Sequence, residues 1–196
     1  MKQLTSEKFK LDVKNHVLTV NLDSGVYRDI SIGKPCSSDM HYNITTRPGY
    51  LIFTGDMGCY VFNRLPDMFD FFRCERINPR YWSEKVQAGK YEEFSPEKAR
   101  EALNSVFKYW KEGTNKDKAF ISNEKSELDA IDTDNEFEFM NAVYEFTANE
   151  GGVELNDFWE CDLKEYTFHF IWCCYAIVHA IELYDQYKTS NLEAQV

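Results

Sequence analysis

The stretch YTFHFIWCCYAIVHAI, from Tyr166 to Ile181, decides how the rest of the chain has to fold. It is the longest apolar stretch of the sequence, and it contains Thr167, His169 and His179. A membrane-spanning helix needs about 20 apolar residues, so this shorter stretch with two imidazoles predicts a buried helix of a soluble protein. Because the helix would be apolar on all sides, we expect it to lie centrally, between a sheet and other helices.

The residues upstream, 13–64, have the alternating pattern of β-strands. Asp23-Ser24-Gly25 and the loop Thr54–Gly58 each separate two alternating segments, which predicts two hairpins. We therefore expect an antiparallel meander of about five strands in the N-terminal third. The predicted strands are Val17–Leu22, Tyr27–Ile32, Tyr42–Thr46, Tyr50–Phe53 and Tyr60–Phe62.

Residues 67–188, which follow the meander and include the apolar stretch, have apolar residues at helical spacing. Caps and first-turn prolines at Asp67, Asn78-Pro79 and Ser95-Pro96 mark helix starts. The predicted helices are a short one after Ser6, then 68–73, Pro79–Ala88, Pro96–Gly113, Lys118–Ile131, Asp134–Asn149, and one from Asp157 or Asp162 to Tyr187, followed by a frayed tail at 189–196. We predict one α+β domain over residues 1–196, with the meander packed by five or six C-terminal helices and one buried central helix.

The net charge is −11, from 33 acidic and 22 basic residues. Between Ser122 and Glu160 there are twelve acids and one base, Lys125, so this segment carries the entire net charge. An acidic chain repels polyanions, so we expect no direct binding to nucleic acid and none to an anionic membrane.

The acidic segment has two interpretations that the sequence leaves open. Most charge runs are solvated helix faces, but ordinary exposed helices alternate signs to form stabilising pairs. Forgoing those pairs suggests an anionic surface that engages a basic partner. The candidate partner-binding residues are Glu124, Glu127, Asp129, Asp132, Asp134, Glu136 and Glu138.

Aromatic residues are interleaved with these acids, and they could anchor either the core or an interface. They are Phe137, Phe139, Tyr144, Phe146, Phe158 and Trp159. Calcium is a weaker third interpretation of the acidic alternation, because Phe137 stands where a calcium loop needs glycine. We expect no metal and no cofactor.

The six cysteines do not predict disulfides or a zinc site. The N-terminus lacks the apolar segment of a secretory signal, so we expect reduced thiols in a cytoplasm. No two cysteines have the spacing of a zinc knuckle. Cys173 and Cys174 lie mid-helix in the apolar stretch, which favours core packing over nucleophilic catalysis.

Asp56 and the histidines are the remaining candidates for chemistry. Asp56 could be an acid, a base or a metal ligand, but a turn residue that accepts from backbone amides is the simpler interpretation. His169 and His179 would lie about 15 Å apart along one helix, too far for one metal ion. A composite site of His41, Arg47, Asp56 and His169 is not selected by any motif, and we expect no catalytic residue.

Four segments of the sequence resemble a family of small proteins carried by tailed bacteriophages and prophages. They are GYLIFTGDMGCYVF (49–62), DMFDFFR (67–73), INPRYWSEK (77–85) and YTFHFIWC (166–173). The resemblance implies an accessory phage protein that acts in the bacterial host cytoplasm and counters host defence. It supplies no catalytic residues.

Two functions follow from the resemblance and the charge. The first is a non-enzymatic inhibitor that presents an acidic, DNA-mimicking surface to a basic groove of a host defence protein or nucleoprotein complex, such as a CRISPR effector or restriction enzyme. The alternative is a small phage enzyme that acts on a nucleotide or host protein through Asp56 and a nearby histidine. A homodimer stays an open alternative.

Overall fold

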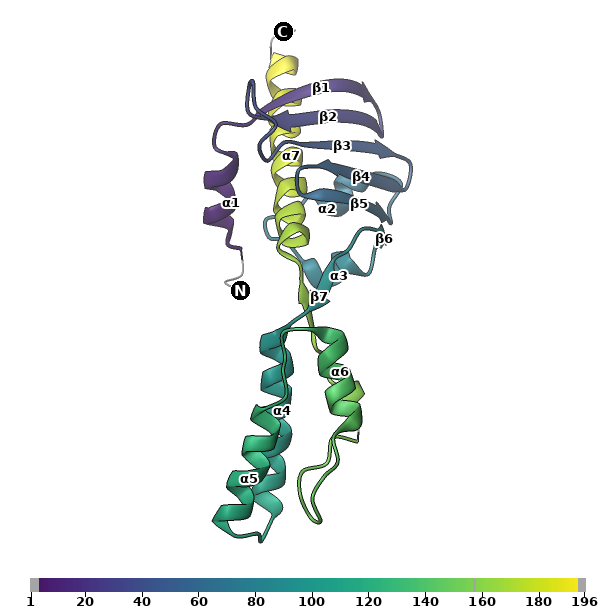
Figure 1. The fold of residues 1–196 in the computed structure, drawn as a ribbon. Helices are drawn as coiled ribbons and strands as arrows, with labels where there is room; N and C mark the ends of the chain where they lie inside the picture. Colours follow the sequence, from purple (N-terminus) through teal and green to yellow (C-terminus); the bar gives the residue numbers. More distant parts are fainter. Residues whose placement is uncertain (1–3, 157, 194–196) are drawn as a thin grey trace. The chain divides into compact units, whose positions relative to one another are not determined.

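The computed structural model describes residues 4–156 and 158–193, shown in Figure 1. Internal contacts group the chain into two compact units, where the sequence led us to expect one domain. Unit 1 comprises the residues up to Glu92 and those from Tyr166 onward, and unit 2 is the insertion Glu93–Glu165. The chain leaves unit 1 through β7 (Glu92–Phe94) and returns through β8 (Lys164–Tyr166), and these two strands pair with each other.

Unit 1 is built on an antiparallel sheet of six strands in the order β1-β2-β3-β4-β5-β6. This confirms the predicted meander and both hairpins. The strands are β1 (Val17–Ser24), β2 (Tyr27–Gly33), β3 (Tyr42–Arg47), β4 (Tyr50–Gly55), β5 (Gly58–Asn63) and β6 (Val86–Ala88).

The last strand corrects the predicted helix from Pro79 to Ala88. Helix α3 spans only Pro79–Ser83, and Val86–Ala88 pairs with β5 instead. The physical reason is the edge of β5, whose backbone groups need partners. The Asn63 amide, for example, donates to the Lys85 carbonyl at 3.1 Å.

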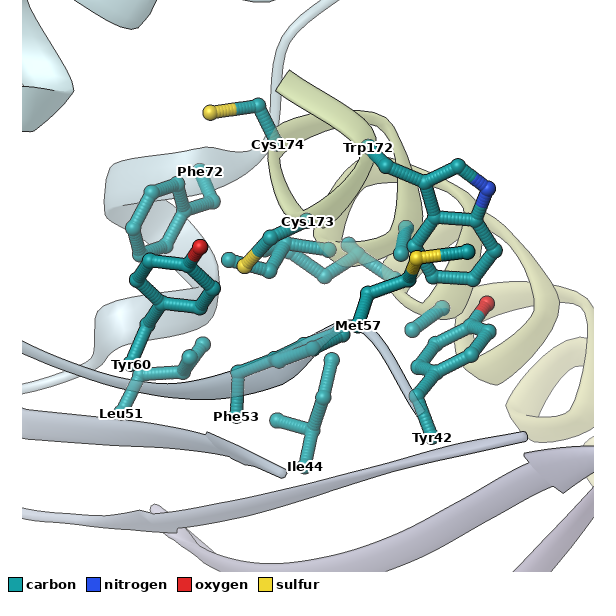
Figure 2. Close-up of a cluster of buried hydrophobic side chains, with 14 of the residues drawn as sticks. Tyr42, Ile44, Leu51, Phe53, Met57, Tyr60, Phe72, Trp172, Cys173 and Cys174 are labelled. Atoms are coloured by element: carbon teal, nitrogen blue, oxygen red, sulfur yellow. The ribbon is translucent and has the colours of Figure 1, made fainter. Parts of the chain in front are cut away.

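The predicted buried central helix is α7 (Phe168–Glu193). It contributes Trp172, Cys173 and Cys174 to the main core of unit 1; Trp172 and Cys173 face the sheet, whereas Cys174 points away from the strands (Figure 2). The Trp172 ring lies edge-on to Tyr42 of β3, with ring centroids 5.5 Å apart. The core face of the sheet is formed by Ile30, Ile32, Tyr42, Ile44, Leu51, Phe53, Tyr60 and Phe62.

Helix α7 starts later than predicted. The sequence placed its start at Asp157, which lies outside the described residues, or at Asp162. The structure instead has a short 3₁₀ helix, η1 (Phe158–Glu160), followed by β8. Thr167 is the physical reason for the later start, because its hydroxyl caps the helix by accepting from the Phe170 amide at 3.1 Å. The predicted frayed tail is wrong for residues 189–193, because α7 continues through them to Glu193, and residues 194–196 lie outside the described part.

Helices α1 (Ser6–Val13) and α2 (Met68–Phe72) cover other sides of α7. Figure 1 shows α7 between α1 and the sheet. Phe9 of α1 packs edge-on against Trp172, with centroids 5.1 Å apart. In the part of the chain that the structure describes, no helix is long and apolar enough to cross a membrane.

The Arg28–Asp67 ion pair joins the sheet to α2. The Arg28 guanidinium donates to both carboxylate oxygens of Asp67, at 2.9 and 2.8 Å, and lies over the rings of Phe69 and Tyr184. Burial disfavours the charged guanidinium, but the hydrogen bonds to Asp67 outweigh it and raise the pKa of Arg28. The same bonds lower the pKa of Asp67, which also caps α2 by accepting from the Phe69 amide.

The described residues of unit 2 form three α-helices, in addition to η1, and a core of their own. The helices α4 (Pro96–Gly113), α5 (Lys118–Asp129) and α6 (Glu136–Glu145) confirm the predicted ones, with earlier ends for α5 and α6. Asn135 caps α6 by accepting from the Phe137 and Glu138 amides. The second core consists of Ala99, Leu103, Phe107, Leu128, Ile131, Phe139, Val143, Val153, Leu155, Phe158 and Leu163.

The β4–β5 hairpin depends on Gly55, which has a φ of 154°. A Cβ at this position would press against the backbone of His41 and Tyr42. We expect Gly55→Ala to lower the free energy of unfolding by about 2 kcal/mol, measured by urea denaturation. Gly113→Ala is the matched control, since a Cβ there meets nothing within 4 Å. Equal stabilities of the two variants would contradict the role of Gly55.

Candidate functional site

The net charge of the chain coincides with unit 2. Residues 93–165 contain 19 acids and 8 bases, which gives the full −11, whereas unit 1 has 14 of each. The charge therefore belongs to one compact body. The seven candidate acids all lie in unit 2, but they differ in exposure and in their partners.

Glu124 is not a surface residue, which corrects its place among the partner-binding candidates. Its side chain is fully buried. One carboxylate oxygen accepts from the Asn149 side chain at 2.5 Å, and the other accepts from the Val153 amide at 2.8 Å. Gly152 lies so close that a Cβ there would collide with this carboxylate. Glu124 is thus an internal acceptor that holds the 149–153 loop against α5.

A signal for this burial exists in the sequence. Glu124 lies three residues after Ile121 and four before Leu128, the spacing of one helix face. Leu128 is buried and Ile121 packs against the same core. The apolar neighbours at these positions indicate that Glu124 points inward, a pattern that the charge count obscured.

Glu127 and Asp129 are partly compensated by neighbours. Glu127 accepts from the side chains of Asn123 at 2.8 Å and Asn149 at 3.2 Å. Asp129 pairs with Lys125 one helical turn earlier, and the Arg100 guanidinium lies 3.9 Å from its carboxylate. Asp129 is therefore paired with bases, and the Glu127 carboxylate is held in place by two side-chain amides, so both are weaker candidates than acids that have no side-chain partner.

The other four candidates, Asp132, Asp134, Glu136 and Glu138, are exposed, and we call them the acidic cluster. None of them forms an ion pair with any residue in the described ranges. They span the turn before α6 and its first helical turn, where the helix dipole favours negative charge. Asp132 also accepts from the Asp134 amide at 2.8 Å, which shapes the turn. The cluster is thus locally stable without a counter-charge.

The interleaved aromatic residues divide between the core and the surface. Phe139 and Phe158 are buried and contact each other, with ring centroids 5.6 Å apart. Phe137, Tyr144 and Trp159 are exposed instead. Core packing is therefore confirmed for Phe139 and Phe158, and Phe146 packs half-buried against the same core, whereas the interface interpretation stays a prediction for the three exposed rings.

Asp56 has the geometry of a turn residue. Its carboxylate accepts from the Met40 amide at 2.9 Å, and its own amide donates to the His41 carbonyl at 3.0 Å. The His41 ring in turn donates to the Ser38 carbonyl at 2.6 Å. These contacts close the loop before β3 onto the β4–β5 hairpin.

The composite of His41, Arg47, Asp56 and His169 is not brought together by these contacts. His41 and Arg47 flank opposite ends of β3, and Arg47 lies over the Tyr50 ring at 4.0 Å. His169 is exposed in the first turn of α7. In the described ranges, no group of three or more His, Cys, Asp or Glu side chains is arranged to hold a metal ion.

The two central cysteines have the properties of core residues. Cys173 and Cys174 are fully buried, and all six cysteines of the chain are free. Burial raises the pKa of both thiols well above the usual value, which leaves them protonated and unreactive. The predicted core packing of Cys173 and Cys174 is confirmed.

His179 forms a polar contact inside unit 1. The Tyr42 hydroxyl and the His179 Nδ1 atom form a hydrogen bond of 2.7 Å, and Phe9 packs edge-on against the imidazole. Burial lowers the pKa of His179 from 6.5 to about 4, with a smaller effect from His16. The ring is therefore neutral at pH 7 and shares one hydrogen bond with Tyr42, as expected for a core histidine.

This lowered pKa predicts a loss of stability in mild acid. Below about pH 6.5 the unfolded chain takes up a proton that the folded imidazole resists until about pH 4. The free energy of unfolding should fall by about 2 kcal/mol across this interval, allowing for solvent screening. Urea titrations at several pH values should show this fall in the free energy of unfolding for wild type and its absence for His179→Gln. His169→Gln, at an exposed site, should show the same fall as wild type. An undiminished fall in His179→Gln would refute its assignment to His179.

The burial of Glu124 predicts that its carboxylate stabilises unit 2. Glu124→Leu keeps the bulk but leaves the buried Val153 amide without an acceptor, which should cost about 2 kcal/mol. Amide hydrogen exchange over residues 118–153 should accelerate by about 30-fold. Glu138→Leu, the same exchange at an exposed position, should leave exchange in the core of unit 2 nearly unchanged. Equal protection from hydrogen exchange in both variants would show that the Glu124 carboxylate does not stabilise unit 2.

Comparison of the chain with protein-family models, curated proteins and solved structures found no match. The function is therefore inferred from the residues of the chain and from their geometry. The features that bear on it are the charge of unit 2, the exposed acidic cluster and the exposed aromatics beside it.

Proposed function

We propose that this chain is a phage-encoded, non-enzymatic inhibitor that binds a host nucleic-acid-targeting defence protein through an acidic, DNA-mimicking surface on unit 2. One observation carries the proposal. The entire net charge of −11 lies on unit 2, and the acidic cluster on that unit is exposed without ion-pair partners among the described residues.

The physics of such an interaction favours a basic groove as the target. A groove built for phosphates carries lysine and arginine side chains, which attract an anionic surface and raise association rates by factors of about 10–10³ at low salt. The same charge keeps the protein away from nucleic acid. Inhibition would then arise by competitive occlusion, because the acidic surface occupies the groove that the nucleic acid needs.

The setting that we propose is the cytoplasm of a bacterial host, and the phage-family resemblance of unit 1 segments supports it. The charge geometry favours a CRISPR effector or a restriction enzyme, since both hold nucleic acid in basic channels. The enzyme alternative has less support, because the Asp56 carboxylate serves the backbone of its own turn.

The test is capture from phage-infected bacterial lysate with the full chain as bait. Wild type should retain a nucleic-acid-binding protein at low salt and lose most of it at moderate salt. The variant Asp132→Asn, Asp134→Asn, Glu136→Gln, Glu138→Gln should retain much less, by about tenfold. Purified DNA should compete with the captured protein for binding.

A matched control removes the same number of charges from exposed positions of unit 1, through Asp39→Asn, Glu75→Gln, Glu182→Gln and Glu193→Gln. This variant should capture as wild type does. Equal losses in both variants would indicate a general effect of net charge. Capture that is indifferent to salt and to the acidic cluster would overturn the proposed function.

A further inference from the structure

Helix α6 has two apolar faces, although a surface helix needs only one to join its core. Phe139 is fully buried and Val143 nearly so, and both belong to the core of unit 2. Phe137 and Tyr144 lie on the opposite side, with 73% and 90% of their surfaces exposed. The fold of unit 2 therefore does not use these two rings.

The two exposed rings are aligned along the helix. A spacing of seven residues places side chains about 20° apart around the axis and about 10 Å apart along it. Glu138 and Glu145 have the same spacing and lie about 100° further round the helix. Both acids are exposed, as is Asn141 between the two stripes. Thus α6 presents an aromatic stripe, Phe137 and Tyr144, beside an acidic stripe, Glu138 and Glu145.

This combination differs from a surface that binds by charge alone. Tyrosine and phenylalanine are enriched in the buried centres of protein interfaces, where they contribute more than their neighbours. Two large rings kept in water also work against solubility unless a partner covers them. Tyr109 of α4 is exposed too, but the residues seven positions away from it are Ala102 and Lys116, so it has no second ring in line with it.

The repeat on α6 points to the form of the partner. Apolar residues seven apart on another helix recur every 10 Å or so, which matches the separation of Phe137 and Tyr144. Lysine or arginine beside that apolar seam would meet Glu138 and Glu145. An extended strand presents alternate side chains about 6.6 Å apart and does not match this period.

We propose that the exposed face of α6 docks a basic amphipathic helix of the partner protein, with Phe137 and Tyr144 as apolar anchors. This inference rests on the proposed function and deepens it, because it specifies the partner element and the anchoring residues. Affinity then has two components. The contacts of Glu138 and Glu145 weaken with salt, whereas burial of the two rings does not.

The direct test uses a synthetic helix as the probe. A peptide of about three heptads carries leucine at the first and fourth position of each heptad and lysine elsewhere. A scrambled peptide of the same composition, with no leucine seam, tests charge alone. Isothermal titration calorimetry at low and at about 0.15 M salt measures both peptides against the full chain.

Wild type should bind the seamed peptide at both salt concentrations and the scrambled peptide only at low salt. Phe137→Ser with Tyr144→Ser should weaken binding of the seamed peptide by about tenfold or more. Tyr109→Ser is the matched control and should stay within about twofold of wild type. Because both rings of the double variant are exposed, its circular dichroism should match that of wild type.

A second variant tests the acidic stripe by gain of function. Glu138→Lys with Glu145→Lys should transfer binding from the leucine–lysine peptide to a leucine–glutamate peptide with the same seam. Failure of this transfer in a folded variant would overturn the proposed docking.

The outcomes separate this inference from the proposed function. Wild-type affinity in Phe137→Ser with Tyr144→Ser, together with lost capture when the acidic cluster is neutralised, would refute the docking and leave the charge-based inhibitor standing. No preference for the seamed over the scrambled peptide would likewise refute it. Insensitivity of both capture and peptide binding to every variant would overturn both proposals.

Discussion

The fold of unit 1 depends on one constraint: helix α7 is apolar on all sides and must be covered on all of them. A helix of this kind is stable in water only when other elements cover it on every side. The sheet covers one side through Tyr42 and its neighbours, and α1 covers another through Phe9. Because α7 follows unit 2 in the chain, the core of unit 1 joins segments separated by the 73 residues from Glu93 to Glu165. The pairing of β7 with β8 holds the two ends of that insertion together.

The acidic residues of unit 2 serve two different physical purposes. Glu124 is buried and satisfies two donors, so its carboxylate supports the fold in the way that any buried acceptor must. The acidic cluster lies in water at the start of α6, where the helix dipole tolerates it. A count of charges along the sequence treats these residues as equivalent. Burial excludes Glu124 from the candidate partner surface. The hydrogen bonds of Glu127 and the ion pairs of Asp129 then reduce that surface to the acidic cluster and the acidic stripe that continues along α6.

Local sequence patterns predicted much of the fold and one part of the candidate site. Turn residues predicted both hairpins, caps and first-turn prolines predicted the starts of α2, α3 and α4, and composition identified the central helix. The prediction was wrong for Val86–Ala88 and for the start of α7. In both places long-range hydrogen bonds decide the outcome: β5 recruits β6 as its neighbour, and β8 pairs with β7 before Thr167 opens the helix. Contacts of this kind join residues far apart in the chain, so no local window contains them.

The sequence by itself determined the α+β class, the buried character of residues 166–181 and the concentration of acid between Ser122 and Glu160. Only the tertiary structure decided that the charge belongs to a separate compact unit, that Glu124 is internal, and that Phe137 and Tyr144 are exposed while Phe139 is buried. The physical reason is that an acid or an aromatic ring reads the same in the sequence whether its side chain faces the core or the solvent. Which side of a helix meets a core depends on where the other helices pack, and that arrangement exists only in three dimensions.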